Sequence, residues 1–123
     1  MVAHAMAELP CECCGFLAGN ERIERAILLR NALASPVAYA VEAKELLHIH
    51  RELRAWGLEV RAVYHSHPTS AAIPSVSDLA QNGYGETIPH VIVGMANAEA
   101  EVRAWVLGEV SFSEVEFVID SAN

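Results

Sequence analysis

Residues Leu58 to Asp78 read LEVRAVYHSHPTSAAIPSVSD, and this stretch carries the most information about fold and function. Its first part, Leu58 to Tyr64, is rich in β-branched and aromatic residues and predicts a strand that leads straight into His65 and His67. Residues i and i+2 of a strand project from the same face, so the two imidazoles can hold one ion together. The stretch therefore predicts a strand that ends in half of a metal site.

The second part of the stretch supplies a third candidate ligand, Asp78. A loop of small residues that ends in Pro74 leads to Ser75-Val-Ser-Asp78, where a short helix is predicted from Ser75 to Tyr84. Ser-x-x-Asp is also a capping box with Ser75 as N-cap, and both interpretations can hold because a helix N-terminus fixes the direction of the carboxylate. Two imidazoles and one carboxylate leave positions open for water, as catalytic zinc requires, and the same set can also hold Fe(II) for oxygen chemistry.

A second His-x-His pair, His48 and His50, serves as an internal control. It lies in Glu42 to Trp56, where apolar residues recur every three or four positions and predict an amphipathic helix. Residues i and i+2 of a helix lie about 200° apart around the axis, so this pair cannot share an ion. His4 and His90 have no partner at ligand spacing. We therefore expect all four to be ordinary histidines.

The rest of the chain alternates strand-like runs with helical ones, without repeats or linkers. The remaining predicted elements are a helix over Met1 to Leu9, a hairpin of Phe16 to Gly19 and Ile23 to Arg30, and strands at Tyr39 to Val41, His90 to Gly94, Glu101 to Leu107 and Val110 to Ile119. This order predicts a single domain over residues 1–123 of the α/β (α+β) class, with a mixed β-sheet flanked by helices.

Composition narrows the classes of function. Eight Lys and Arg residues against sixteen Asp and Glu residues give a net charge of −8, which argues against nucleic acid as a partner. The apolar runs are strand-sized and broken by charges, so no membrane segment is expected and the prediction is a soluble, cytoplasmic protein. The clustered Cys11, Cys13 and Cys14 cannot form a disulfide framework and are expected to be reduced thiols. Burial is expected for Cys14, whereas Cys11 and Cys13 have no evident role.

Two motifs together resemble the JAMM (MPN+) family of zinc metallopeptidases. His65-x-His67, seven residues, then Ser75-x-x-Asp78 is similar to the metal-binding signature of the family, and PCECCGFLAG at residues 10–19 is similar to its glutamate-bearing segment. The resemblance covers nearly the whole chain and implies a cytidine-deaminase-like MPN/JAMM fold.

The resemblance also implies a role for each matching residue. His65, His67 and Asp78 would hold one Zn²⁺ per chain, Glu12 would be the general acid/base, and Ser75 would donate a hydrogen bond to the oxyanion. These roles agree with elementary chemistry, since zinc acidifies water, a carboxylate can carry its proton, and a hydroxyl stabilises developing negative charge. On residue type alone, Glu12 would be a solvated surface acid.

The resemblance is strongest to the small bacterial branch of the family, whose members are similar to peptidases that act on sulfur-carrier proteins of ubiquitin-like fold. It implies hydrolysis of an amide bond at the Gly-Gly C-terminus of such a partner, for example with release of cysteine, and it leaves a homodimer open. By the family pattern, the chain begins within the first helix and is expected to lack the usual N-terminal strand. The short connection from Asp78 to His90 leaves no room for the insertion that grips ubiquitin chains.

Two other functions remain open at this point. A non-catalytic MPN scaffold would only bind partners, although such modules typically lack some of the ligands that this chain has. A zinc deaminase would use His50-Arg-Glu52 and Pro10-Cys-Glu-Cys-Cys14, which match H-x-E and P-C-x-x-C in reversed order. That reading leaves the set of His65, His67 and Asp78 without a role.

Overall fold

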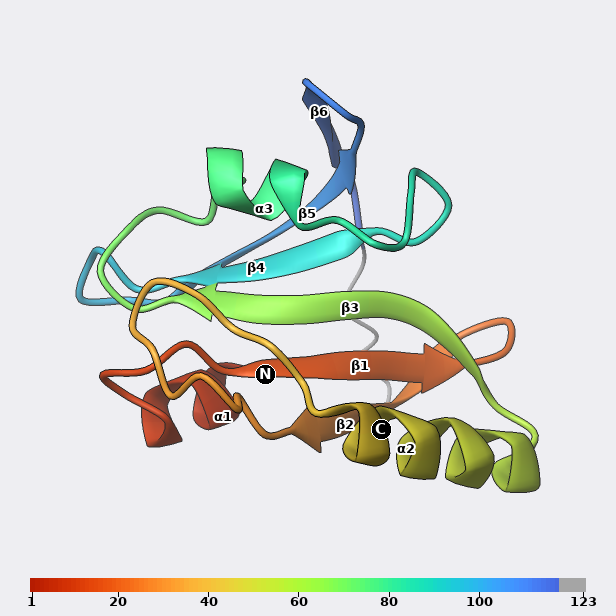
Figure 1. The fold of residues 1–123 in the computed structure, drawn as a ribbon. Helices are drawn as coiled ribbons and strands as arrows, with labels where there is room; N and C mark the ends of the chain where they lie inside the picture. Colours follow the sequence, from red (N-terminus) through yellow and green to blue (C-terminus); the bar gives the residue numbers. More distant parts are fainter. Residues whose placement is uncertain (118–123) are drawn as a thin grey trace.

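The computed structural model describes residues 1–117 and shows one mixed six-stranded sheet with helices packed against it (Figure 1). The strand order is β2-β1-β3-β4-β5-β6, and every neighbouring pair is antiparallel except β3 and β4. The strands are β1 (Cys14–Gly19), β2 (Ile23–Leu29), β3 (Glu59–His67), β4 (His90–Gly94), β5 (Glu101–Leu107) and β6 (Phe112–Val115). The helices are α1 (Val2–Ala7), α2 (Ala43–Trp56) and α3 (Val76–Ala80). The predicted α+β class with a mixed sheet is confirmed.

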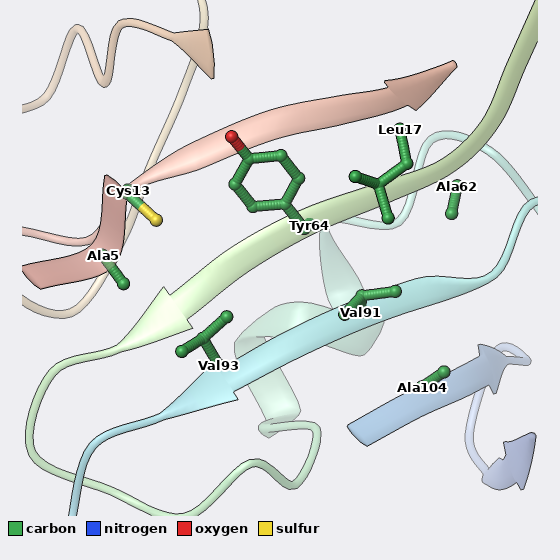
Figure 2. Packing of buried hydrophobic residues seen from close by; sticks show 8 residues of the cluster. All are labelled: Ala5, Cys13, Leu17, Ala62, Tyr64, Val91, Val93 and Ala104. Atoms are coloured by element: carbon green, nitrogen blue, oxygen red, sulfur yellow. The ribbon is translucent and has the colours of Figure 1, made fainter. Parts of the chain in front are cut away.

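The alternation of side chains along each strand divides the core between the two faces of the sheet. On one face, Cys13 and Leu17 pack in a cluster with Ala5 of α1 (Figure 2). On the other face, Phe16 packs with Leu53 of α2. The cluster in Figure 2 consists of Ala5, Cys13, Leu17, Ala62, Tyr64, Val91, Val93 and Ala104. Helices α1 and α2 therefore cover opposite faces.

Helix α3 lies on the same face as α2. Ile92 of β4 packs with Leu79 of α3, whereas its neighbours Val91 and Val93 point to the face covered by α1. The register pairs His65 with Ile92, so the side chain of His65 shares this face. The end of β3 therefore opens onto a space between α2 and α3.

Tyr64 connects the central strands to the first helix. Its hydroxyl lies 2.9 Å from Nδ1 of His4, and both side chains are buried. Its ring lies across Gly15 of β1, where a Cβ would come within 2.3 Å of the ring. Glycine at position 15 thus allows the packing that fixes α1 to the sheet. His4 is a core residue, as its lack of ligand-spaced partners suggested.

Most predicted elements are confirmed, with shifted ends. Helix α2 ends at Gly57, which adopts φ +70° and whose N–H bonds to the Arg54 carbonyl, as expected for a glycine that terminates a helix. Strand β3 runs three residues beyond the predicted Tyr64, so His65 and His67 lie within the strand. The first helix is shorter than predicted and spans Val2–Ala7. None of the helices in residues 1–117 has the length and apolar character needed to cross a membrane.

Three predicted elements need correction. Tyr39 to Val41 is not a strand: the side chain of Asn31 bonds the Ala38 carbonyl and the Ala40 N–H, and the Ala40 carbonyl accepts from the Ala32 N–H. The predicted helix to Tyr84 ends at Ala80, where the Asn82 side chain starts to bond the backbone instead. The last strand is limited to Phe112–Val115, and positions 118 and 119 of the prediction lie outside the described residues.

Candidate metal centre

The two histidines of the central motif lie at the end of β3, deep in the space between α2 and α3. His65 and His67 are 1% and 6% exposed. The strand alternation that predicted a shared face is present, and the two Nε2 atoms are 3.2 Å apart. The ring centroids are 5.0 Å apart. The local periodicity of a strand is thus sufficient to bring the two imidazoles together.

Asp78 reaches the histidines from the first turn of α3. The capping box is present: Ser75 Oγ accepts from the Asp78 N–H at 3.0 Å, and Asp78 Oδ2 accepts from the Ser75 N–H at 2.9 Å. The same carboxylate places Oδ1 3.2 Å from Nε2 of His65 and Oδ2 3.1 Å from Nε2 of His67. Asp78 therefore caps its helix and faces both imidazoles, so the two interpretations of the motif hold together.

The spacing of these three side chains fits a divalent metal ion. Bonds of about 2.0–2.1 Å in a tetrahedral zinc site place the ligand atoms roughly 3.3 Å apart. The contacts between the three side chains are 3.1–3.2 Å, and the candidate ligand atoms all lie within 4.8 Å of one another. Across residues 1–117, no other group of three or more His, Cys, Asp or Glu side chains converges in this way. The donor set could bind a metal ion without rearrangement of the fold.

The ring of His67 is oriented by the loop that follows β3. Its Nδ1 lies 2.9 Å from the carbonyl of Ala71, which can only accept, so Nδ1 carries a proton and Nε2 is the nitrogen that can bind a metal ion once it gives up the proton it shares with Asp78. The loop is held in turn by Trp105, whose indole N–H donates to the Ala72 carbonyl at 2.9 Å. It also runs so close to β4 that a Cβ on Gly94 would lie 2.3 Å from the Ala72 nitrogen. These contacts fix the donor atom of His67.

The ring of His65 makes its polar contacts through one nitrogen. Tyr39 stacks on it with ring centroids 5.0 Å apart and an interplanar angle of 28°. Its buried Nδ1 has no hydrogen-bond partner within the part of the chain that the structure describes. In residues 1–117, the two polar contacts of the ring, with His67 and Asp78, are both made at Nε2. The stacked Tyr39 thus holds the ring in an orientation in which Nε2 is the nitrogen available to a metal ion.

The charges within the group are strongly coupled. Burial alone would raise the pKa of Asp78, but hydrogen bonds with His65 and His67 hold it far below its usual range. Burial alone would lower the pKa of His67, but the hydrogen bonds to Asp78 and to the Ala71 carbonyl raise it overall. The carboxylate is thus ionised throughout the physiological pH range, which a metal ligand requires.

Glu12 lies beside this group because of the pairing of β1 with β3. Cys14 pairs with His65, and continuing the antiparallel register places Glu12 opposite His67, on the same face of the sheet. The side chain is buried, at 4% exposure. Burial raises the pKa of Glu12 to about 7, with His67 opposing the rise and Asp78 adding to it. A carboxyl group with this pKa can both accept and donate a proton near neutral pH.

A cavity of about 490 Å³ adjoins the group, and its lining contains residues that the sequence analysis missed. Tyr39, Tyr84 and His90 line it together with His65 and Asp78. His90, which was predicted to be an ordinary histidine, lies outside the metal-binding group; burial, with the nearby His65, lowers its pKa to about 4 and keeps it neutral. Among Tyr39, Tyr84 and His90, the sequence offered a signal only for His90, which begins a predicted strand. The structure shows that this strand pairs with β3.

The other histidines and the cysteines take no part in the group. His48 pairs with Glu52 one turn along α2, with 3.0 Å between Nε2 and Oε1. His50 packs its ring against Phe16 at 5.6 Å between centroids. Cys14 is buried as predicted, and burial raises the pKa of its thiol to about 12. Within residues 1–117, no metal-binding group combines His50 with the cysteines, so the zinc deaminase alternative finds no support.

Comparison with known families agrees with this geometry. A family model described as prokaryotic homologs of the JAB domain matches residues 1–108. The chain belongs to this JAB family. The match spans all the residues of the candidate centre, from Glu12 to Asp78, and all the strands up to β5.

Several curated relatives of this JAB domain have names that state an activity. A protein named desampylase from Pyrococcus furiosus is 37% identical over 89% of this chain and 76% of its own length. A probable TtuB-protein conjugate cleaving protease from Thermus thermophilus is 38% identical over 87% of this chain and 69% of its own length. A CysO-cysteine peptidase from Mycobacterium tuberculosis is 40% identical over 64% of this chain and 56% of its own length.

Solved structures confirm the fold of the JAB domain. Protein DSY2949 from Desulfitobacterium hafniense superposes with a TM-score of 0.86 and 26% identity, covering 98% of this chain and 86% of that one. AF2198, a JAB1/MPN domain protein from Archaeoglobus fulgidus, superposes with a TM-score of 0.59 and 20% identity, covering 94% of this chain and 83% of that one. The predicted JAMM/MPN resemblance and MPN-type fold are therefore confirmed.

Proposed function

We propose that this protein is a zinc-dependent hydrolase that cleaves an amide bond at the Gly-Gly C-terminus of a ubiquitin-like or sulfur-carrier protein, for example with release of cysteine. The observation that carries the proposal is the convergence of His65, His67 and Asp78 beside a buried Glu12 whose pKa is raised to about 7. A structural metal site would need a closed set of four ligands and no adjacent acid. Three ligands with an open side and a poised carboxyl group are the parts that hydrolysis requires.

Zinc is the metal that the donor set favours. Two neutral imidazoles and one carboxylate are common zinc ligands, and Fe(II) can use the same set. The presence of Glu12 favours zinc over Fe(II) in this proposal, because a hydrolase needs a proton carrier and an oxygenase does not. When bound, zinc supplies Lewis acidity, which lowers the pKa of water to about 7 and polarises a carbonyl group.

Glu12 is the general acid/base of the proposed reaction. Its carboxylate takes a proton from the attacking water and later gives it to the leaving amine, so the same group must be able to hold and release a proton at neutral pH. Its burial in the space opposite His67 provides this property. Such proton transfer typically contributes about 10²-fold to 10⁴-fold to the rate.

Ser75 is the proposed donor to the oxyanion of the tetrahedral intermediate. Its Oγ already accepts a hydrogen bond from the Asp78 N–H, which occupies a lone pair and leaves the hydroxyl hydrogen free to donate. The cap also fixes Ser75 next to Asp78 at the start of α3. One such donor is typically worth about 10²-fold to 10³-fold in kcat.

The substrate class is supported by the relatives and by the shape of the chain. The relatives named desampylase, TtuB-protein conjugate cleaving protease and CysO-cysteine peptidase support a protein-linked substrate, with cysteine as the group released in one case. The segment between α3 and β4 is short, so a slim, extended tail is a better fit than a large folded surface. Glycine residues suit such a tail, because they let its backbone approach the centre closely. A homodimer and a cytoplasmic location remain predictions of the sequence.

The proposal is tested by mass spectrometry of a purified carrier protein that carries cysteine on its Gly-Gly terminus. Zinc-loaded wild-type protein should remove one cysteine residue, and Glu12→Gln should retain zinc but lower kcat by about 10²-fold to 10⁴-fold. Glu52→Gln, which loses only a pairing with His48 along α2, is the matched control and should cleave like wild type. An adduct that stays intact beside efficient cleavage of linked ubiquitin would refute the substrate, and near wild-type turnover by Glu12→Gln would remove Glu12 from the mechanism.

A further inference from the structure

We infer that two asparagines, Asn31 and Asn82, are positioning residues that each hold one wall of the cavity beside the metal centre. The inference rests on the proposed function and deepens it, because it names what shapes the binding site for the substrate tail. The two walls carry Tyr39 and Tyr84, which line the cavity next to His65. Each tyrosine lies in an irregular segment, where regular strand or helix hydrogen bonds cannot fix it.

Asn31 organises the segment between β2 and α2. Its Nδ2 donates to the carbonyls of Ala38 and Glu12, both at 3.0 Å, with a longer contact of 3.5 Å to Ser35. Its Oδ1 accepts from the backbone N–H groups of Leu33 at 3.1 Å and Ala40 at 3.2 Å. An asparagine side chain has two donor hydrogens and two acceptor lone pairs, so all of its capacity is used.

The contacts of Asn31 have two consequences for the site. Ala38 and Ala40 flank Tyr39, so this one side chain sets the backbone on both sides of the tyrosine that stacks on His65. The bond to the Glu12 carbonyl ties the same segment to the residue that carries the proposed acid/base. Asn31 therefore adds a side-chain connection between this wall and Glu12, beside the backbone bond from the Glu12 N–H to the Ser35 carbonyl at 2.8 Å.

Asn82 plays the equivalent part in the segment between α3 and β4. Its Nδ2 donates to the carbonyls of Gly85 and Leu107, both at 3.1 Å. Its Oδ1 lies 3.0 Å from the backbone nitrogen of Tyr84 and 3.0 Å from Nε2 of His90. The two carbonyls can only accept, which settles the orientation of the amide and requires the proton of His90 to be on Nε2.

The result is a fixed position for Tyr84 at the cavity wall. The ring of Tyr84 meets His90 and Phe16 edge-on, with centroids 6.2 Å and 6.4 Å apart. His90 is buried and lies beside the central strand, so Asn82 links an exposed turn to the rigid sheet. Among residues 1–117, the partners of the Asn82 side chain do not include Glu12, His65, His67 or Asp78. Its loss should therefore affect substrate binding more than the chemical step.

Amide hydrogen exchange, followed by NMR, tests whether the two side chains hold these segments. In Asn82→Ala the amide of Tyr84 should exchange at least tenfold faster than in wild type, with no change at Leu33 and Ala40. Asn31→Ala should give the reverse pattern. The matched control is Asn20→Ala, which removes a single bond to the Gly57 carbonyl at the far turn and should alter neither segment. Equal exchange at Tyr84 in Asn82→Ala and wild type would overturn the inference.

Steady-state kinetics with the carrier adduct then separate positioning from general stability. Zinc-loaded Asn82→Ala should raise KM about threefold to tenfold with kcat within twofold of wild type, the effect expected when a binding surface loses its fixed position. Asn31→Ala should raise KM and also lower kcat, because Asn31 also bonds Glu12. If an alanine variant fails to fold, the corresponding Asp variant keeps an acceptor oxygen, replaces the donor nitrogen by a charged oxygen that repels the facing carbonyls, and should show the same direction of change.

The outcomes distinguish this inference from the proposed function. A wild-type KM for Asn82→Ala, beside normal cleavage by wild type, overturns the inference and leaves the function intact. Wild-type protein that leaves the adduct intact refutes the function, and the exchange data alone then decide whether the asparagines hold the two segments.

Discussion

Gly94, at the end of β4, controls how closely the loop after β3 can approach the sheet. A Cβ at this position would lie 2.3 Å from the Ala72 nitrogen and 2.7 Å from the Ala71 carbonyl carbon. Both are backbone atoms, which cannot rotate away as a side chain can. Ala71 is also the residue whose carbonyl accepts the Nδ1 proton of His67 at 2.9 Å. Substitution by alanine therefore moves the loop that orients a candidate metal ligand.

The size of the effect follows from these distances. Ordinary contacts of a Cβ begin at about 3.4 Å, so the loop must shift by roughly 1 Å to admit the methyl group. A shift of this size breaks the bond between His67 and Ala71, and loss of such a partner typically lowers metal affinity about 10-fold to 100-fold. Overpacking should also destabilise the metal-free protein by about 1–3 kcal/mol.

Competition with a fluorescent chelator measures the zinc affinity of Gly94→Ala, and thermal unfolding of the metal-free protein measures its stability. Gly83→Ala is the matched control, because nothing lies within 4 Å of its added methyl group. We expect weaker zinc binding for Gly94→Ala and unchanged binding for Gly83→Ala. A zinc affinity of Gly94→Ala within twofold of wild type would show that the loop does not orient His67.

Two further predictions concern ionisation and the choice of ligands. The pKa of Glu12 is about 7 in the metal-free fold against an ordinary value of 4.5. Below pH 4.5 the carboxyl is protonated in both the folded and the unfolded protein, and as the pH rises to 7 only the unfolded protein loses the proton readily. The free energy of unfolding of the wild type therefore falls between pH 4.5 and pH 7. Each pKa unit corresponds to about 1.4 kcal/mol, so metal-free Glu12→Gln should gain about 3 kcal/mol relative to wild type between pH 4.5 and pH 7.5 in urea titrations. Parallel pH profiles for the two proteins would contradict this. For metal content, the double change of His65 and His67 to alanine should abolish zinc binding, whereas the double change of His48 and His50 should leave about one zinc per chain; loss of zinc from the second variant would move the site to α2.

The convergence of His65, His67 and Asp78 could be predicted from the sequence because its geometry is local. The projection of His65 and His67 from one face follows from the period of a strand, and the direction of Asp78 follows from the cap of a short helix. The role of Glu12 could not be judged from residue type, since its burial depends on the pairing of β1 with a strand about fifty residues away. Only the family resemblance suggested that role.

The cavity walls could not be predicted for a different physical reason. Tyr39 and Tyr84 are placed by hydrogen bonds from two asparagine side chains rather than by a regular ladder, and such bonds leave no periodic signal in the sequence. The same side-chain bonds explain why Tyr39 to Val41 was wrongly predicted as a strand. A side chain that bonds backbone groups in place of a neighbouring strand can therefore be recognised only once the structure shows which segments it connects.

The assignment of His65, His67 and Asp78 as metal ligands is tested most directly by identifying the atoms that surround bound zinc. X-ray absorption spectroscopy of the zinc-loaded protein should show nitrogen and oxygen ligands at about 2.0–2.1 Å, with the multiple-scattering signature of two imidazoles. The spectrum should be unchanged when Cys11, Cys13 and Cys14 are replaced by serine. Sulfur at about 2.3 Å, or a single imidazole, would contradict the assignment of His65, His67 and Asp78 as the metal ligands.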